Sequence, residues 1–517
     1  MTDRGRLSPH VKAVAAVVVI GAIMSILDTT IVNVALESIS QDLHAPLGTI
    51  QWIATGYLLA LATVIPLTGW AAERFGPKRV WMTAVTGFVL TSALCAAAWS
   101  AESLIVFRVL QGLAGGMIMP IGMITLAQAA GPQHMGRVMS IVGVPMLLAP
   151  VLGPVLGGVL VEHLSWRWIF LVNLPIGIVG LALAARLLPS ARAQGTAGPA
   201  TLDVRGLLML SPGVALFVFG LSEIASHGGA TGVATFGPLV AGAALIAAFA
   251  VHAWRAPRPL VDVRLLRSRG FAAAAATVTL VGAALFGGML LLPLYYQIDR
   301  GLSPLEAGLL IAPQGFGAAF AMHWSGRMTD RIGGGRVVVA GLIVLSLGTL
   351  PFVFVTGTTP YWLLAGALVI RGVGLGFTMM PAMASAYATL RHDQVPRATP
   401  MLNVLQRVGG SIGTAVLAVA LQSQIRDAVA GAGVPRVPGA IEAVPPAARA
   451  QLADPVAAAF ASTYWWAMGL VLLALIPATV LARAQRAAQA QAREAAAREA
   501  AAELDERRTE AQLAAVG

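Results

Sequence analysis

Asp28 is the residue whose position most strongly suggests chemistry. It lies late in an apolar run that is long enough to cross a bilayer, and Thr29, Thr30 and Asn33 are close to it. A carboxylate at membrane depth costs several kcal/mol unless nearby groups offset the loss of water, so such residues usually mark function. We expect Asp28 to carry protons along a polar path. The alternative is that it only ties its helix to a neighbour through a buried hydrogen bond.

Arg108 is the second informative charge. At 1.5 Å per residue it lies ~9 Å from the outer end of its helix near Glu102, and Asp28 lies ~13 Å from the outer end of its own helix near Glu37. The two charges are therefore expected at similar depth. A nearby cation lowers the pKa of a carboxyl group and burial raises it, so access to water could switch Asp28 between protonation states. The alternative is a static ion pair that holds the two helices together.

The composition is that of a membrane protein. Of 517 residues, 57% are hydrophobic and 11% are charged, which excludes an ordinary soluble domain. The net charge of +11 does not indicate nucleic-acid binding, because the basic residues fall in short loops between apolar runs. The single cysteine, Cys95, excludes an intrachain disulfide framework and a cysteine-based metal site.

Fourteen segments are long and apolar enough to span a bilayer, which takes ~20 residues each. The first is too long for a signal-peptide core, so we expect it to remain in the protein. Lys and Arg fall mainly in the segments that are internal if the N-terminus is cytoplasmic, which predicts that both termini are cytoplasmic. The segments are approximately 11–36, 48–70, 79–100, 102–127, 136–160, 166–188, 204–223, 235–254, 271–295, 302–324, 335–356, 360–384, 398–423 and 460–482.

Two pairs of motifs recur at nearly the same spacing. Gly69–Arg79 returns as Gly326–Arg336, a shift of 257 (326 − 69), and the glycine-rich stretch after Arg108 returns after Arg371, a shift of 263 (371 − 108). Parallel repeats of six spans with a substrate site between them are typical of one large transporter class. We expect six-helix halves at 1–190 and 270–482, a linker region at 191–269 with two extra spans (about 204–223 and 235–254), an outer loop of low order at 424–458, and a helical cytoplasmic tail at 483–517.

The ordered motifs resemble those of the major facilitator superfamily, and specifically its fourteen-span drug:proton antiporter branch. Leu27–Leu36 is similar to the helix-1 signature of that branch, although Glu37 stands where Pro is common. Gly69–Arg79 resembles the loop motif G-x-x-x-D-R-x-G-[RK]-[RK], with Glu73 at the usual Asp. Three further stretches resemble motifs of the same branch. Arg108–Gly116 is similar to its helix-4 arginine motif, Ala149–Gly158 to its helix-5 antiporter motif, and Trp166–Gly177 to its helix-6 entry.

The resemblance implies an all-α fold with helices in a 6+2+6 order and two pseudo-symmetric halves around a central cavity. It implies a gate in the loop motif, for which plain membrane orientation is the alternative at Lys78 and Arg79. It implies a seal against proton leak in the helix-5 motif, for which close helix packing is the alternative. The gate residues are Gly69, Glu73, Arg74, Gly76, Lys78, Arg79, Asp330 and Arg331, and the helix-5 residues are Pro150, Gly153, Pro154, Gly157 and Gly158. Candidates for the substrate cavity are Asn33, Tyr57, Gln111, Tyr295, Gln297, Gln314, Asn403 and Gln406.

The implied function is proton-coupled antiport that exports drugs or other amphipathic or cationic small molecules from the cytoplasm by alternating access. Asp28 and Arg108 would couple the proton. The energy would come from the proton gradient, so we expect no cofactor, no metal and no enzymatic activity. The expected partners are the lipid bilayer of the cell (inner) membrane, the small-molecule substrate and H⁺, with no nucleic acid and with the chain acting as a monomer. The motifs do not separate H⁺ from Na⁺ coupling.

Several other classes compete with this interpretation. An exporter or flippase of an endogenous metabolite or lipid, and a uniporter or symporter of the same fold, remain open. An ATP-driven pump is not indicated, because there is no G-x-x-x-x-G-K-[ST] motif and the only lysines are Lys12 and Lys78. A membrane-bound enzyme is not indicated either, because D-D-x-x-D and H-E-x-x-H patterns are absent.

Overall fold

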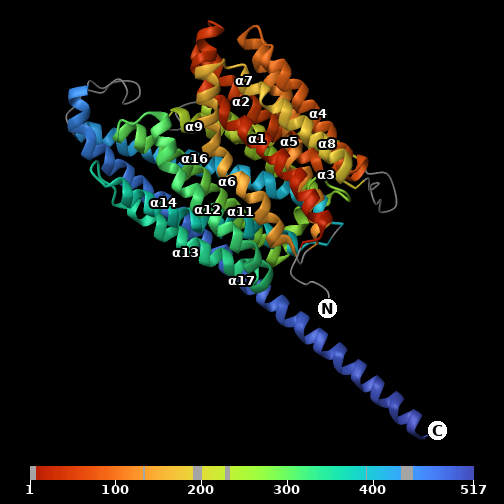
Figure 1. Cartoon of the computed structure of the whole chain (residues 1–517). Helices are drawn as coiled ribbons and strands as arrows, with labels where there is room; N and C mark the ends of the chain where they lie inside the picture. The colour runs from red at the N-terminus through yellow and green to blue at the C-terminus, as the bar shows by residue number, and fades with distance from the viewer. Residues whose placement is uncertain are drawn as a thin grey trace.

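A computed structural model describes residues 7–131, 134–189, 201–227, 233–391, 393–431 and 446–516, and these ranges contain helices and no strand. Figure 1 shows the helices gathered into one bundle from which the end of the last helix projects. The helices are α1 (Pro9–Asp42), α2 (Leu47–Val64), η1 (Ile65–Leu67), α3 (Thr68–Phe75), α4 (Pro77–Ala96), α5 (Ala101–Ala130), α6 (Met135–His163), α7 (Trp168–Leu171), α8 (Asn173–Leu187), α9 (Val204–His227), α10 (Val233–Arg255), η3 (Val263–Arg267), α11 (Arg269–Leu294), η4 (Tyr295–Asp299), α12 (Pro304–Ile332), α13 (Gly334–Val353), α14 (Tyr361–Gly376), α15 (Met379–Ala388), α16 (Val395–Gly431) and α17 (Pro446–Val516).

Within the described residues, 12 helices are long and apolar enough to cross a membrane. Several of them combine two consecutive elements, such as α2 with α3 or α14 with α15. Two further helices, α6 and α12, are each 29 residues long. The bundle is therefore built from membrane-length helices.

Three of the expected spans are interrupted rather than continuous. The second breaks at η1, where Pro66 cannot donate a backbone hydrogen bond. The sixth divides into α7 and α8, and Asn173 is the first residue of α8. The twelfth divides into α14 and α15 at Phe377 and Thr378. A hydropathy pattern does not report such breaks, because the apolar residues continue through them.

The expected outer loop at 424–458 is partly wrong. α16 continues to Gly431, and α17 begins at Pro446, so both ends of this stretch are helical. Alanine is frequent in both stretches and has the highest helix propensity, which explains the extension. Residues 432–445 lie outside the described ranges. The expected helical tail at 483–517 is observed as far as Val516, in the same helix as the last span.

The apolar core is shared at one end of the bundle and divided at the other. We call the shared end the base; α1 begins there and the α17 tail leaves it (Figure 1). One core cluster joins both halves, with Val14 and Val138 from the first half and Ala398 and Leu402 from the second. At the opposite end, which we call the top, residues such as Ile31 form one cluster and residues of the second half form a separate one. The halves therefore meet at the base and diverge towards the top.

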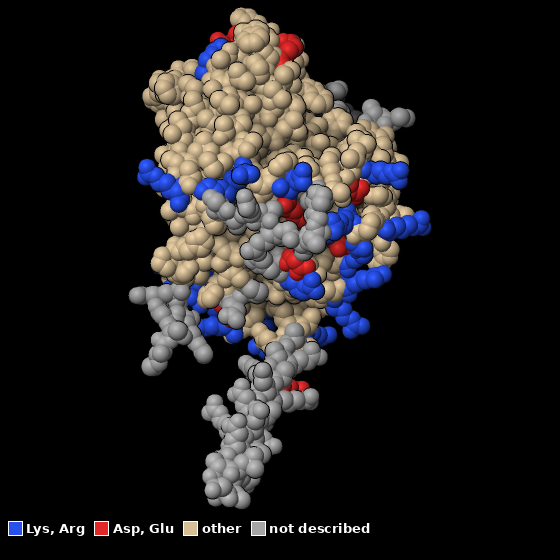
Figure 2. All heavy atoms as spheres, turned by 90° about the vertical axis from the view of Figure 1, so that its right-hand side faces the viewer, with Lys and Arg blue, Asp and Glu red and all other residues tan. Residues whose placement is uncertain are grey.

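The two extra helices form a hairpin beside the line where the halves meet. α9 packs on α10, on α2 of the first half and on α16 of the second half. Trp52 of α2 stacks on Phe219 of α9, with ring centroids 5.9 Å apart. Charged residues are gathered elsewhere on the molecule: Figure 2 shows Lys and Arg crowded over the lower part of one face, below a largely uncharged region.

Candidate functional site

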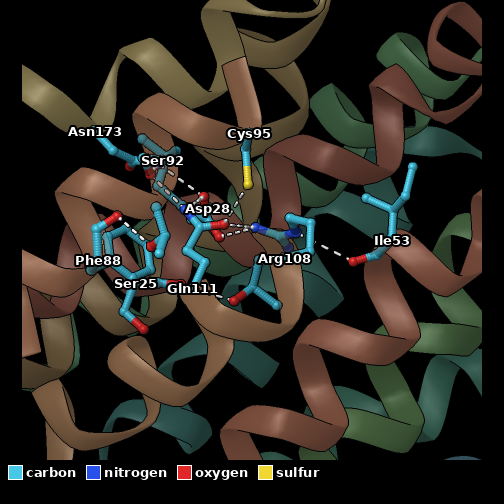
Figure 3. Close-up of polar contacts among 12 residues, drawn as sticks. Ser25, Asp28, Ile53, Phe88, Ser92, Cys95, Arg108, Gln111 and Asn173 are labelled. Atoms are coloured by element: carbon cyan, nitrogen blue, oxygen red, sulfur yellow. Dashed lines mark hydrogen bonds and ion pairs between the residues drawn. The ribbon is translucent and has the colours of Figure 1, made fainter. Parts of the chain in front are cut away.

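Asp28 and Arg108 meet inside the first half. Arg108 Nη1 lies 2.6 Å from Asp28 Oδ2, and the two side chains are 1% and 0% exposed. α5 begins with a capping box at Ser100 and Ser103, which fixes how far below the top Arg108 enters the bundle. Figure 3 shows the two charges facing each other. The predicted similarity of depth is therefore matched by direct contact.

The other carboxylate oxygen of Asp28 accepts two hydrogen bonds. Gln111 Nε2 donates at 3.1 Å and Asn173 Nδ2 donates at 2.8 Å. Ser92 Oγ in turn accepts from Gln111 and Asn173, at 2.5 and 3.2 Å. Five side chains from α1, α4, α5 and α8 thus form one buried polar network (Figure 3).

Arg108 also binds groups other than the carboxylate. Its Nη1 donates to Gln111 Oε1 at 2.6 Å, and its Nε donates to the Ile53 carbonyl of α2 at 3.2 Å. Its guanidinium carbon lies 3.9 Å from the centroid of the Tyr57 ring. A cation over an aromatic face is attracted by the ring electrons, and the attraction is stronger when both are desolvated. The arginine is therefore satisfied on several sides within the first half.

The Asp28–Arg108 pair depends on both of its charges. Removing either charge would leave the other buried and uncompensated, which is strongly unfavourable. Asp28 faces the interior of the first half rather than lipid, and in this conformation it is fully enclosed. Proton exchange at Asp28 therefore requires a second conformation in which water reaches the network.

Asn173 and Ser92 are network residues that the sequence analysis did not select. Asn173 lies within the helix-6 entry Trp166–Gly177, so the signal was present in a motif that had been recognised. Its direction could not be read from the pattern, because the break between α7 and α8 sets it. Ser92 carried no signal, since a single serine in an apolar helix is common.

A first ion pair joins the two halves at the base. Arg397, near the start of α16, donates to both carboxylate oxygens of Glu73 on α3, at 3.0 and 3.3 Å. A Cβ atom added at Gly69 would lie 2.3 Å from the Pro396 carbonyl oxygen, so only glycine permits this approach. Gly69 and Glu73, two of the predicted gate residues, therefore lie at a contact between the halves. The sequence analysis did not identify Arg397 as the partner of Glu73.

A second ion pair repeats the first across the molecule. Asp330 near the end of α12 accepts from Arg137 Nε at 3.0 Å and from the backbone N–H of Gly136 at 2.9 Å. Asp330 follows Glu73 by 257 residues (330 − 73), and Arg397 follows Arg137 by 260 (397 − 137). The two contacts are therefore related by the same repeat as the motifs. We call them the two latches of the base.

The other predicted gate residues lie in or next to the turns that follow α3 and α12. Gly76 has φ = 84° in the turn between α3 and α4, and Gly333 has φ = 88° in the corresponding turn before α13. Lys78 Nζ donates to the carbonyls of Ala185 and Leu188 at the end of α8. Basic residues with exposed side chains at these turns are Arg74, Arg79 and Arg331.

The helix-5 glycines pack on α1. Cβ atoms added at Gly153 and Gly157 would meet Thr30 and Ile31, whereas one at Gly158 would meet nothing within 4 Å. The packing interpretation accounts for Gly153 and Gly157. The side chains of Pro150 and Pro154 lie outside the described set.

The second half has an arginine in the corresponding place but a different surrounding. Arg371 of α14 is 4% exposed, and its Nη1 donates to Gln314 Oε1 at 3.3 Å. Its Nε has no hydrogen-bond partner in the described part of the chain. A Cβ atom added at Gly288 of α11 would meet Arg371 Nη2, so a glycine faces this arginine where Asp28 faces Arg108.

The remaining cavity candidates are not brought together as one site. Tyr57 and Gln111 belong to the Asp28 network, and Gln314 belongs to the Arg371 contact. Tyr295 is buried in the upper core of the second half, where its hydroxyl donates to the Thr356 carbonyl at 3.1 Å. The others are the exposed Asn33, the half-buried Gln297 and Asn403, and the buried Gln406.

Comparison with known proteins agrees with this architecture. A model described as Major Facilitator Superfamily matches residues 18–414. A multidrug resistance protein B homolog of Mycobacterium tuberculosis is 41% identical over 497 residues, which cover 93% of this chain and 92% of that protein. The tetracenomycin C resistance and export protein of Streptomyces glaucescens is 32% identical over 443 residues, which cover 84% and 80%.

Among solved structures, the human organic anion transporter MFSD10 matches with a TM-score of 0.61 at 17% identity, over 91% of this chain and 100% of that one. At this identity the match supports the fold alone. The relatives are transporters and not enzymes, and the apolar helices make the chain a multi-pass membrane protein. With the family model covering most of the sequence and the helical repeat visible in both halves, this chain belongs to the major facilitator superfamily, among its multidrug efflux transporters.

Proposed function

We propose that the protein exports drugs or other amphipathic small molecules in exchange for protons, by alternating access between its two halves. The observation that carries the proposal is the Asp28–Arg108 pair, a fully enclosed carboxylate and its counter-cation within a membrane-length bundle. Intramembrane carboxylates are costly, and proton relays are among their main uses. The relatives named for multidrug resistance and for export support the direction of transport.

The arrangement of the bundle supports alternating access. The base is the cytoplasmic side in this proposal, because the start of α1, the α17 tail and the basic surface of Figure 2 lie there and Lys and Arg favour the cytoplasmic side. The latches hold the base closed while the cores diverge towards the outside. Rocking of one half against the other would break the latches and open the base to cytoplasmic cargo.

The same proposal includes the finer arrangement of spans. With α6 and α12 counted among the spans, the bundle has fourteen, in two halves at 1–190 and 270–482, and the α9–α10 hairpin lies in the linker at 191–269. The chain works as a monomer in the inner membrane with both termini cytoplasmic. The proton gradient alone supplies the energy, so no cofactor is involved.

Asp28→Asn tests the proposal directly. In inverted membrane vesicles with an imposed pH gradient, wild type should move dansyl-labelled test compounds and release protons when they are added. Asp28→Asn should lose proton-coupled movement when transport is normalised to the amount of protein in the vesicles, because the amide cannot exchange a proton. Asp42→Asn is the matched control, since Asp42 is a half-exposed carboxylate at the top of the same helix, paired with Arg167. Coupled transport by Asp28→Asn would reject the mechanism.

A further inference from the structure

Arg407 is a cation in the middle of α16 for which the described part of the chain provides no partner. Within the described residues, no hydrogen bond, ion pair or ring contact holds its guanidinium, and its side chain is partly exposed. It lies twelve residues after Val395 at the base (407 − 395), or ~18 Å along the helix, which is near the middle of a ~30 Å hydrocarbon layer. Partial exposure at this depth means that the described side chains do not fully cover the guanidinium.

The face of α16 that bears Arg407 is turned towards the first half. Pro396 and Pro400 contact Gly69 of the first half at the base. Arg407 follows Pro400 by seven residues, which places both on the same helix face two turns apart. The opposite face is occupied, because Gly409 and Gly413 pack on the backbone of α11.

Arg407 also lies at the level where the halves separate. Val404, one turn nearer the base, belongs to the core shared by both halves, whereas Leu417 belongs to the upper core of the second half alone. On the first half, Tyr57 belongs to the shared core and Ile53 to the separate upper core. Arg407 thus lies close to the level at which the cores of the two halves separate.

The positive charge near Arg407 is not balanced by a nearby carboxylate among the described contacts. Asp28 is satisfied by Arg108, Gln111 and Asn173 inside the first half, so it does not compensate Arg407. Arg371, the other intramembrane arginine of the second half, also lacks a carboxylate partner among the described contacts. Among the described contacts, the second half therefore presents uncompensated positive charge at the centre of the bundle. Arg371 is buried, whereas Arg407 is partly exposed.

We propose that Arg407 binds a negatively charged group of the cargo, so that the preferred substrates are amphipathic organic anions such as aromatic carboxylates or phenolates. A guanidinium matches a carboxylate in planar, paired hydrogen bonds. A cationic compound would be repelled by the same charge. The inference rests on the proposed export function and narrows its cargo, whereas the sequence alone included cationic compounds.

The test uses three dansyl compounds that differ in charge. Dansylglycine is an anion, dansylglycinamide is neutral and dansylcadaverine is a cation. Binding of each to the purified full chain in lipid nanodiscs is measured by dansyl fluorescence, for wild type, Arg407→Gln, Arg407→Lys and Arg426→Gln. Arg426 is the matched control, because it is an exposed arginine near the far end of the same helix.

Wild type should bind dansylglycine at least about ten-fold more tightly than dansylglycinamide, the value of one charge-assisted contact. Arg407→Gln should abolish that preference and bind dansylcadaverine at least as well as wild type, while Arg407→Lys and Arg426→Gln should keep the preference. Equal binding of the anion and the amide by wild type would overturn the inference, and this comparison holds even if Arg407→Gln does not fold.

Transport separates this inference from the proposed function. If the anion binds through Arg407 but an imposed pH gradient never moves it in proteoliposomes, the antiport proposal fails and the binding inference stands. If wild type transports dansylcadaverine under the gradient and neither binds nor moves dansylglycine, the antiport proposal stands and the anion inference fails.

Discussion

Arg108 is held in the first half by three hydrogen bonds and an aromatic ring. Asp28 is held by Arg108, Gln111 and Asn173. Such a buried pair is often not more stable than a well-packed apolar pair, yet breaking it from one side is costly because a charge is stranded. The pair is therefore better explained by a function for its charges than by a contribution to stability.

The cost of leaving one buried charge without its partner gives a prediction about stability. Arg108→Met should destabilise the purified protein by about 3–5 kcal/mol, because Asp28 would remain ionised and unpaired inside the half. The double variant Asp28→Asn with Arg108→Met should recover much of that loss, since no charge is then stranded. Thermal unfolding in detergent measures both. A double variant as unstable as the sum of the two single variants would contradict the account.

The sequence predicted this pair better than it predicted the surroundings of the pair. Depth can be counted along a helix, so Asp28 and Arg108 were placed at comparable levels. Rotation about the helix axis cannot be counted when both faces are apolar. For that reason Asn173 was not selected, and Tyr295 was expected in the cavity although it is packed in the upper core of the second half.

Among the elements, α3 and α16 meet most closely at the first latch. Gly69 permits this contact, because any Cβ would lie 2.3 Å from a backbone oxygen that cannot rotate away. Gly69→Val should therefore force the base apart. Labelling of an introduced thiol at Ser140→Cys, which lies against Gly326 at the second latch, should become about ten-fold faster, as a shift of ~1.4 kcal/mol would give.

The control for this variant is Gly366→Val, where an added Cβ would meet nothing within 4 Å. The native Cys95 is fully buried and should stay unlabelled. Because the label sits at one latch and the substitution at the other, an increase shows that the halves separate as rigid bodies. An unchanged labelling rate in Gly69→Val would mean that the latches open independently.

The second latch should respond to pH. Burial raises the pKa of Asp330, and the Gly136 N–H and the Arg137 guanidinium offset this only in part. With the base open, Asp330 would be in water near its ordinary value of 3.8. The closed base therefore binds a proton more tightly than the open base. Acidification should favour closure, and this contribution should disappear as the pH rises through the raised pKa.

Labelling at Ser140→Cys as a function of pH measures this effect. The rate should fall on acidification towards the carboxyl range more steeply in the wild-type background than with Asp330→Asn. The ratio of the two rates removes the intrinsic pH dependence of the thiol reagent. A ratio that does not change with pH would show that Asp330 does not control closure.

For the whole molecule, the repeat predicted the halves but not how they differ. The latches and the glycine turns recur in both halves, which the motif spacing of 257 and 263 residues anticipated. The buried carboxylate does not recur, because Gly288 faces Arg371. The position of α9 between α2 and α16 was also beyond prediction, since an apolar hairpin fits any lipid-facing groove. The helical backbone is therefore repeated in both halves, whereas the buried Asp28–Arg108 pair lies in the first half.

Because the buried carboxylate lies in the first half, Arg108 and Arg371 should respond differently to the same substitution. Arg371→Met should change the free energy of unfolding by no more than about 1 kcal/mol, or should stabilise the protein, because the described contacts of Arg371 include no carboxylate that would be stranded. Arg108→Met removes the same side chain from the other half and should cost several times more, because it strands Asp28. Parallel thermal unfolding of the two variants compares like with like, since both arginines are almost fully buried. Equal losses would mean that Arg371 has a buried anionic partner of its own, and proton coupling could then not be assigned to the first half alone.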